Sequence, residues 1–180
     1  MKIRLIVIAA TCVAYTLLDL LNHYVFRALE FKQMVHWIYL PSGLRLAFVL
    51  IFAAMGAIGV AFGSALIGFL HYFAHDPMTA LLTGMGSGLA PYLARYACHD
   101  WLNMDLELRN LTPGKLLAIS VVFAVMSASL QQAVLLWRGY TDHFAQDTFV
   151  MASGDLLGTI IVIYLAKLTI LAVGAGLKSR

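Results

Sequence analysis

The sequence predicts an all-α integral membrane protein, and three observations support this fold class. Hydrophobic residues make up 62% of the 180 residues, whereas charged residues make up only 12%. The mean hydropathy is +0.85, so a globule of this size could not bury its apolar surface. The apolar residues also form runs long enough for a helix to cross a hydrocarbon core about 30 Å thick. We therefore expect one polytopic membrane domain over residues 1–180, with the lipid bilayer as its surroundings.

Four apolar runs each match a single crossing of the bilayer. They lie near residues 3–27, 78–98, 114–138 and 149–173. The first run begins with Met1-Lys2-Ile3-Arg4, a start that is typical of a secretory signal, but it continues to Phe26, beyond the usual length of a signal core. We therefore interpret it as the first transmembrane helix.

The stretch from Ser42 to Phe73 matches neither one crossing nor two. As one helix it would be about 48 Å long, too long for a single crossing and short for a pair. Gly56 and Gly59 predict a break around Ala57-Ile58, and Pro41 predicts the start of a helix. A break gives six transmembrane helices, whereas an unbroken stretch gives five.

The distribution of basic residues favours six helices with both termini in the cytoplasm. The basic residues inside would be Lys2, Arg4, Arg95, Arg109, Lys115, Lys178 and Arg180, and those outside Arg27, Lys32 and Arg138. A five-helix chain with its N-terminus outside also follows the positive-inside rule, so this alternative stays open. The pattern predicts a multi-pass protein of a bacterial inner membrane. Without a basic cluster beside aromatic residues, no nucleic-acid partner is indicated.

Four ionisable residues share a similar depth near the outer surface in the six-helix arrangement. They are Asp19, His23, Arg45 and Asp155. A charge at the bilayer centre costs about 2.5–3.5 kcal/mol on insertion scales, so Arg45 needs a partner at its own depth. We expect Asp155 or Asp19, and Asp155 is preferred because Asp19 has His23 one helical turn away. The four residues form either the wall of a ligand pocket or an ion-pair network that fixes helix register.

Catalytic and metal-binding motifs are missing from the sequence. There is no Gly-x-Ser nucleophile turn, no His-Glu-x-x-His helix and no phosphate-binding glycine loop, so we do not expect an enzyme. His71 and His75, with His143, form a weak zinc pattern that lacks three ligands at a recognised spacing. Cys12 and Cys98 lie in separate apolar runs and have no ligand spacing. We expect no resident metal and no cofactor.

The cytoplasmic segment 99–114 has the spacing of a short interfacial helix. Its apolar residues Trp101, Met104, Leu108 and Leu111 recur at helical intervals. Its acidic balance favours a protein partner over anionic lipid.

Three segments resemble the bacterial membrane-associated sensor domain of the MASE type. They are Tyr39-Leu40-Pro41-Ser42-Gly43, the glycines Gly56, Gly59 and Gly63, and Gly154-Asp155-Leu156-Leu157-Gly158. The resemblance makes Pro41, Gly43, Gly154 and Gly158 motif residues that open two of the helices. It implies a role in signal transduction, in which the domain binds a small ligand or a partner protein. Such domains usually precede a histidine kinase or a diguanylate cyclase, and since neither follows Arg180 we expect a stand-alone domain.

Two other functions remain open. Six short spans, glycine-rich helices and polar groups in the outer half are similar to the substrate-binding subunit of energy-coupling-factor vitamin transporters. That similarity implies a small-molecule transport subunit that works with separate ATPase partners. The third hypothesis is a structural membrane partner without a ligand, whose ion pairs only fix the helix register.

The topology can be tested with reporter fusions. Fusions after Lys115 and after Arg180 should both report a cytoplasmic location, and a fusion near His143 should report an external one, because basic loops stay inside. A cytoplasmic signal at His143 would contradict the six-helix arrangement and the common depth of the ionisable residues.

Overall fold

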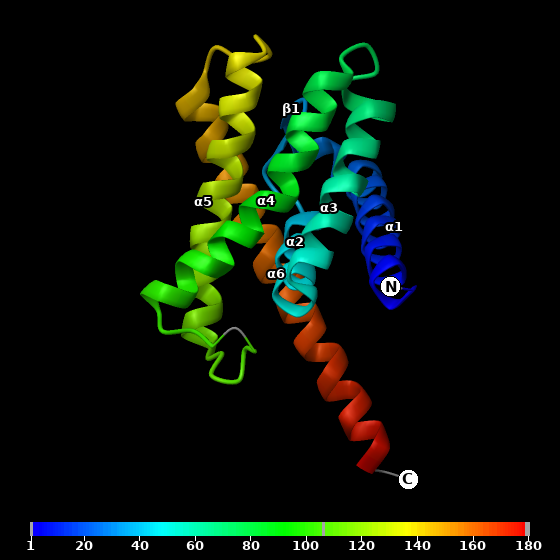
Figure 1. The fold of residues 1–180 in the computed structure, drawn as a ribbon, viewed down its shortest axis with the longest axis vertical. Helices are drawn as coiled ribbons and strands as arrows, with labels where there is room; N and C mark the ends of the chain where they lie inside the picture. Colours follow the sequence, from blue (N-terminus) through cyan, green and yellow to red (C-terminus); the bar gives the residue numbers. More distant parts are fainter. Residues whose placement is uncertain (1, 106, 179–180) are drawn as a thin grey trace.

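The computed structural model describes residues 2–105 and 107–178, and it is almost entirely helical (Figure 1). The helices are α1 (Lys2–Val25), α2 (Pro41–Phe52), α3 (Ala54–Ile67), α4 (Pro77–Trp101), α5 (Pro113–Trp137) and α6 (Phe144–Lys178). Short elements join them: the 3₁₀ turn η1 (Arg27–Leu29), the antiparallel hairpin of β1 (Glu30–Lys32) and β2 (Val35–His36), and the π-helical turn η2 (Gly68–Tyr72). The predicted all-α membrane fold is confirmed.

Helix length separates α2 from the other helices. Four helical stretches in the described chain are long and apolar enough to cross a membrane: Lys2–Val25, Ala54–Tyr72, Pro113–Trp137 and Phe144–Thr169. Helix α4 has 25 residues, whereas α2 has only 12 and spans about 18 Å, well short of a 30 Å core. Helix α4, which contains the predicted crossing at residues 78–98, is not among these four stretches. The number of crossings therefore depends on both α2 and α4, and the choice between five and six stays a prediction.

The chain reverses between α2 and α3 at Ala53, three residues before Gly56, the first of the two glycines at which a break was predicted. Ala53 has φ 50° and ψ −127°, a backbone conformation that L-residues rarely adopt. Gly56 and Gly59 both lie inside α3, so the predicted break around Ala57-Ile58 is wrong. These glycines serve close packing instead: a Cβ on Gly56 would lie 2.2 Å from the carbonyl oxygen of Phe48. The predicted helix start at Pro41 is confirmed.

Helix α2 lies in the middle of the bundle. Helices α1, α3, α4, α5 and α6 pack against one another in that order, and α2 contacts all five of them (Figure 1). The largest buried apolar cluster forms where α2 meets α4 and α5, with Leu46 and Leu50 against Ala90, Ala94 and Phe123. The short helix is thus surrounded by protein for most of its length.

The segment after α4 does not form the predicted interfacial helix. Helix α4 ends at Trp101, and the described residues between it and α5 form turns, with Leu108 at φ 60°. Met104 is fully buried, and Leu108 and Leu111 pack against the core, whereas Trp101 is 74% exposed. The prediction is wrong because three of its four apolar side chains point into the protein rather than along a membrane-facing helix side.

The start of α4 is capped and tied to the end of α5. The Asp76 carboxylate accepts hydrogen bonds from the backbone N–H and the hydroxyl of Thr79. It also accepts two from Nη2 of Arg138, at 3.0 and 2.9 Å, and one from the hydroxyl of Tyr140. Hydrogen bonds from Thr79 and Arg138 hold the pKa of Asp76 well below its usual range. Two helix ends far apart in sequence are therefore joined.

Helix α6 lies directly against the backbone of the segment that precedes α2. A Cβ on Gly154 would lie 2.0 Å from the carbonyl oxygen of His36, and one on Gly158 would lie 1.9 Å from that of Tyr39. Gly43 meets α6 from the other side, because its Cβ would lie 2.5 Å from that of Val162. The motif glycines therefore allow a close approach of α2 and its entry segment to α6.

The close approach predicts the effect of adding one methyl group. Gly158→Ala should lower stability by about 1–3 kcal/mol, because the new Cβ meets rigid backbone rather than a movable side chain. The measurement is thermal unfolding of the detergent-solubilised protein. Gly86→Ala on α4 is the matched control, since nothing lies within 4 Å of its Cβ position. Equal melting temperatures for the two variants would show that α6 does not need the glycine.

Candidate functional site

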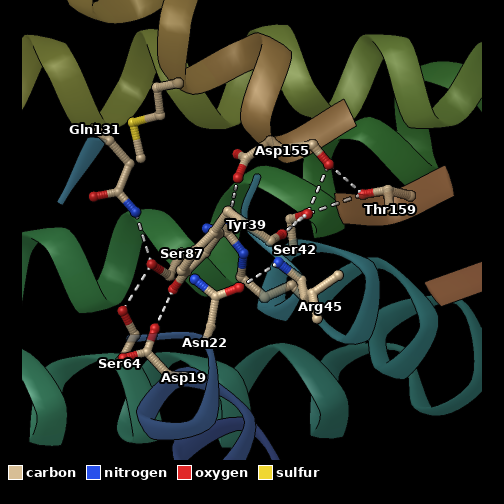
Figure 2. Close-up of polar contacts among 12 residues, drawn as sticks. Asp19, Asn22, Tyr39, Ser42, Arg45, Ser64, Ser87, Gln131, Asp155 and Thr159 are labelled. Atoms are coloured by element: carbon tan, nitrogen blue, oxygen red, sulfur yellow. Dashed lines mark hydrogen bonds and ion pairs between the residues drawn. The ribbon is translucent and has the colours of Figure 1, made fainter. Parts of the chain in front are cut away.

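A fully buried ion pair joins α2 to α6 (Figure 2). Nη2 of Arg45, near the start of α2, lies 2.8 Å from Oδ1 of Asp155 on α6, and both side chains are only 1% exposed. The predicted pairing of Arg45 with Asp155 is therefore confirmed. Removing one partner of such a pair costs more than the pair itself contributes, since it leaves a buried charge uncompensated.

Hydroxyl groups attach the first turn of α2 to the backbone of α6. Oγ of Ser42 lies 2.7 Å from the carbonyl oxygen of Asp155 and 3.2 Å from Oγ1 of Thr159. Thr159 also donates to the Asp155 carbonyl, at 2.7 Å. Polar contacts of this kind replace water, which is absent from the core of a bilayer. Neither Ser42 nor Thr159 was predicted as a site residue, although Ser42 lies within the segment Tyr39–Gly43 that carries the family resemblance.

Asp19 enters this network through a tyrosine rather than through His23. The hydroxyl of Tyr39 donates to Oδ1 of Asp19 at 2.5 Å and lies 2.8 Å from the hydroxyl of Tyr15. The guanidinium carbon of Arg45 lies 5.3 Å from the centre of the Tyr39 ring, within cation–π range. Tyr39 therefore lies between Asp19 and Arg45, whereas the suggested pairing of Asp19 with His23 stays a prediction.

The extended segment before α2 has its backbone donors satisfied by α1 and α6. The N–H of Tyr39 donates to the carbonyl of Gly154 at 3.1 Å, and the N–H of Leu40 donates to Oδ1 of Asn22 at 3.0 Å. Non-helical backbone is tolerated at membrane depth only when protein buries it in this way. Asn22 is a further network residue that sequence reasoning missed.

A second set of hydrogen-bonded side chains connects α3, α4 and α5 (Figure 2). Oγ of Ser64 lies 2.8 Å from Oγ of Ser87, which accepts a hydrogen bond from Nε2 of Gln131 at 2.8 Å. These residues and Arg45 line a cavity of about 20 Å³, which is room for about one water molecule. Nε of Arg45 and Oε1 of Gln131 are buried and have no hydrogen-bond partner among the described residues, so polar groups are available to bind such a water.

His23 contacts a different set of side chains from those bonded to Arg45. Its ring packs edge-on against that of His71, with 4.8 Å between ring centres. His23 also lies near Glu30 and His36. One nitrogen or oxygen atom from each of these three side chains lies within 4.8 Å of the other two. Burial lowers the pKa of His36 below its ordinary value. Asp19 therefore belongs to the network, whereas a role for His23 beside Arg45 and Asp155 stays a prediction.

The network connects four parts of the fold. We call it the Arg45 cluster and define it as Asp19, Tyr39, Ser42, Arg45, Asp155 and Thr159. It joins α1, the segment before α2, α2 itself and α6. The cluster therefore connects α1 to the contact between α2 and α6.

A comparison with protein families gives one match. The family model described as MASE1 matches residues 6–171. No curated protein and no solved structure matches the chain. The matched range includes all three segments that carried the resemblance in the sequence.

The buried pair predicts a strong effect of single substitutions. Arg45→Ala should leave the Asp155 carboxylate buried without its partner, at a cost of about 3–5 kcal/mol. The measurement is the thermal stability of the solubilised protein together with its yield in the membrane. Asp142→Asn, an exposed carboxylate, is the control and should behave as the parent.

Exchanging the two charges distinguishes an ion pair that only fixes the helix register from one that also binds a charged ligand. Arg45→Asp combined with Asp155→Arg should recover the stability that either single change removes. If the pair only fixes register, function recovers with folding; if it holds a charged ligand, folding recovers without binding. Single variants as heat-resistant as the parent would contradict the pairing.

Proposed function

The chain belongs to the MASE1 family of membrane-associated sensory domains, and we propose that it receives a signal through the Arg45 cluster and transmits it as a movement of α6. Its long apolar helices agree with a multi-pass membrane protein. The observation that carries the proposal is the buried Arg45–Asp155 pair, because it links the central helix to the last one.

A buried ion pair is suited to a two-state response. With both partners in contact, α2 is held against α6; with one partner neutralised or engaged elsewhere, an uncompensated charge costs about 3–5 kcal/mol and drives repacking. Closely packed helices change between discrete arrangements rather than continuously. A small ligand or a partner protein that alters the Arg45 cluster would therefore shift the population between arrangements.

Helix α6 is the element able to carry that change away from the cluster. It has 35 residues, about 52 Å, which exceeds the thickness of a hydrocarbon core. Its C-terminal part, in orange and red, extends past the ends of the other helices (Figure 1). Because Asp155 lies in the first half of α6, a displacement there would be passed along a continuous helix to this end.

The size of the cavity favours a sensory response over the transport alternative. The space beside Arg45 measures about 20 Å³, whereas sites for small organic molecules usually measure about 300–1,000 Å³. A vitamin-sized substrate could enter this site only after the helices had moved apart. The same movement is what a sensory domain would use as its output.

Distance measurements between spin labels test the proposal. After Cys12→Ser and Cys98→Ala, labels are placed at Ile51 on α2 and Leu168 on α6, which are 67% and 44% exposed. Asp155→Asn removes the carboxylate charge at nearly constant shape, so we expect the label distance in lipid discs to shift by about 2 Å or more. Distances as in the exposed control Asp142→Asn would show that the pair does not control α6.

A further inference from the structure

Three metal-ligating side chains from separate elements meet outside the Arg45 cluster. His23 comes from the last turn of α1, Glu30 from β1 and His36 from β2. Each offers one nitrogen or oxygen atom, and these three atoms lie within 4.8 Å of one another. Two imidazoles and one carboxylate form a donor set typical of zinc and of other divalent first-row metals.

The histidines of this group lack the hydrogen bonds that buried polar atoms normally have. His36 is only 3% exposed, and neither Nδ1 nor Nε2 makes a hydrogen bond of normal length and angle to the residues described. Nδ1 of His23 is also buried and, within the same part of the chain, has no partner. Because burying an imidazole without a partner is costly, such atoms need an explanation. A bound cation that takes their lone pairs supplies one.

The fold holds the three residues together independently of any ligand. Glu30 and His36 are directly opposite each other in the hairpin, and the N–H of Trp37 donates to the carbonyl of Leu29 at 3.0 Å. The ring of His36 stacks on that of Tyr39, with ring centres 5.5 Å apart and planes 26° apart. The donors are therefore placed on restrained elements, as a metal site requires.

We propose that His23, Glu30 and His36 bind a divalent transition-metal ion of the zinc class. Zinc ligands at about 2.0–2.2 Å from the metal lie about 3.3 Å apart in a tetrahedron, so the donors must close by at most about 1.5 Å from their present 4.8 Å. Side-chain rotation can supply this change. The fourth position is open to water or to His71, whose ring already packs against His23.

The metal would act on the sensory machinery through Tyr39. His36 stacks on the ring of Tyr39, and the Tyr39 hydroxyl donates to Asp19 while its ring lies beside the Arg45 guanidinium. Fixing His36 on a metal would therefore restrain the same tyrosine that links Asp19 to Arg45. This consequence rests on the proposed function, whereas the metal site itself does not.

Metal binding is measured on the full chain in detergent, purified through a tag without histidine. After treatment with a chelator, the protein is titrated with Zn²⁺ against a competing chelating dye. We expect one ion per chain, and an affinity at least about tenfold weaker for His23→Ala and for Glu30→Gln. His75→Ala and His143→Ala, which change exposed histidines outside the group, are the controls and should bind as the parent.

The visible absorption of bound Co²⁺ gives a second measurement of metal binding, and it does not require the replacement of a buried residue. His36→Ala removes a nearly inaccessible side chain and could prevent folding, whereas Glu30→Gln keeps the shape of its side chain. Co²⁺ bound to the parent should give the visible absorption of a four-coordinate nitrogen and oxygen site, and Glu30→Gln should weaken it. No stoichiometric ion on the parent, or equal binding by His23→Ala and Glu30→Gln, would overturn the site.

The two proposals can fail separately. Zn²⁺ bound by the parent with no change in the distance between labels at Ile51 and Leu168 supports the metal site and removes its link to α6. No Zn²⁺ binding, with the distance change of Asp155→Asn still present, overturns the metal site and leaves the proposed function intact.

Discussion

A charge inside a bilayer must be paired, and the pair between Arg45 and Asp155 is the interaction on which the other contacts of this fold depend. It draws a helix of 12 residues into the centre of the bundle and holds it against α6. The close approach of α6 to α2 and to the segment before α2 requires glycine at 43, 154 and 158, because a methyl group at any of them would meet an atom at 2.5 Å or less. The motif glycines and the Arg45–Asp155 ion pair therefore belong to the same contact between α6 and α2 with its preceding segment.

The long helices and the ion pair could be predicted from the sequence, because both follow from the cost of exposing polar groups to lipid. Hydropathy indicates which segments cross the bilayer. The partner of Arg45 must lie at the same depth in the bilayer as Arg45 itself, which leaves few acidic residues to choose from. The turn at Ala53 could not be predicted, since glycine, not alanine, normally adopts its conformation. The contacts of Tyr39 with Asp19 and Arg45 depend on how three helices pack, which single-sequence periodicity does not contain.

Periodicity was misleading between α4 and α5 for a physical reason. Apolar residues three or four apart indicate a helix only if all of them face one side. In this segment Met104 fills the core while Trp101 is exposed, and positive φ values at Asn103 and Leu108 bend the chain to allow it. The hairpin of β1 and β2 was missed because each strand has three residues or fewer, too few to show an alternating pattern.

The sequence distance between the two charges has a consequence for how the protein is made. Arg45 precedes Asp155 by 110 residues, so at about 5–20 residues per second a ribosome needs roughly 5–20 s to supply the counter-charge. During this time Arg45 is without the carboxylate that it pairs with in the folded protein. The contact between α2 and α6 can therefore form only after α6 has been made.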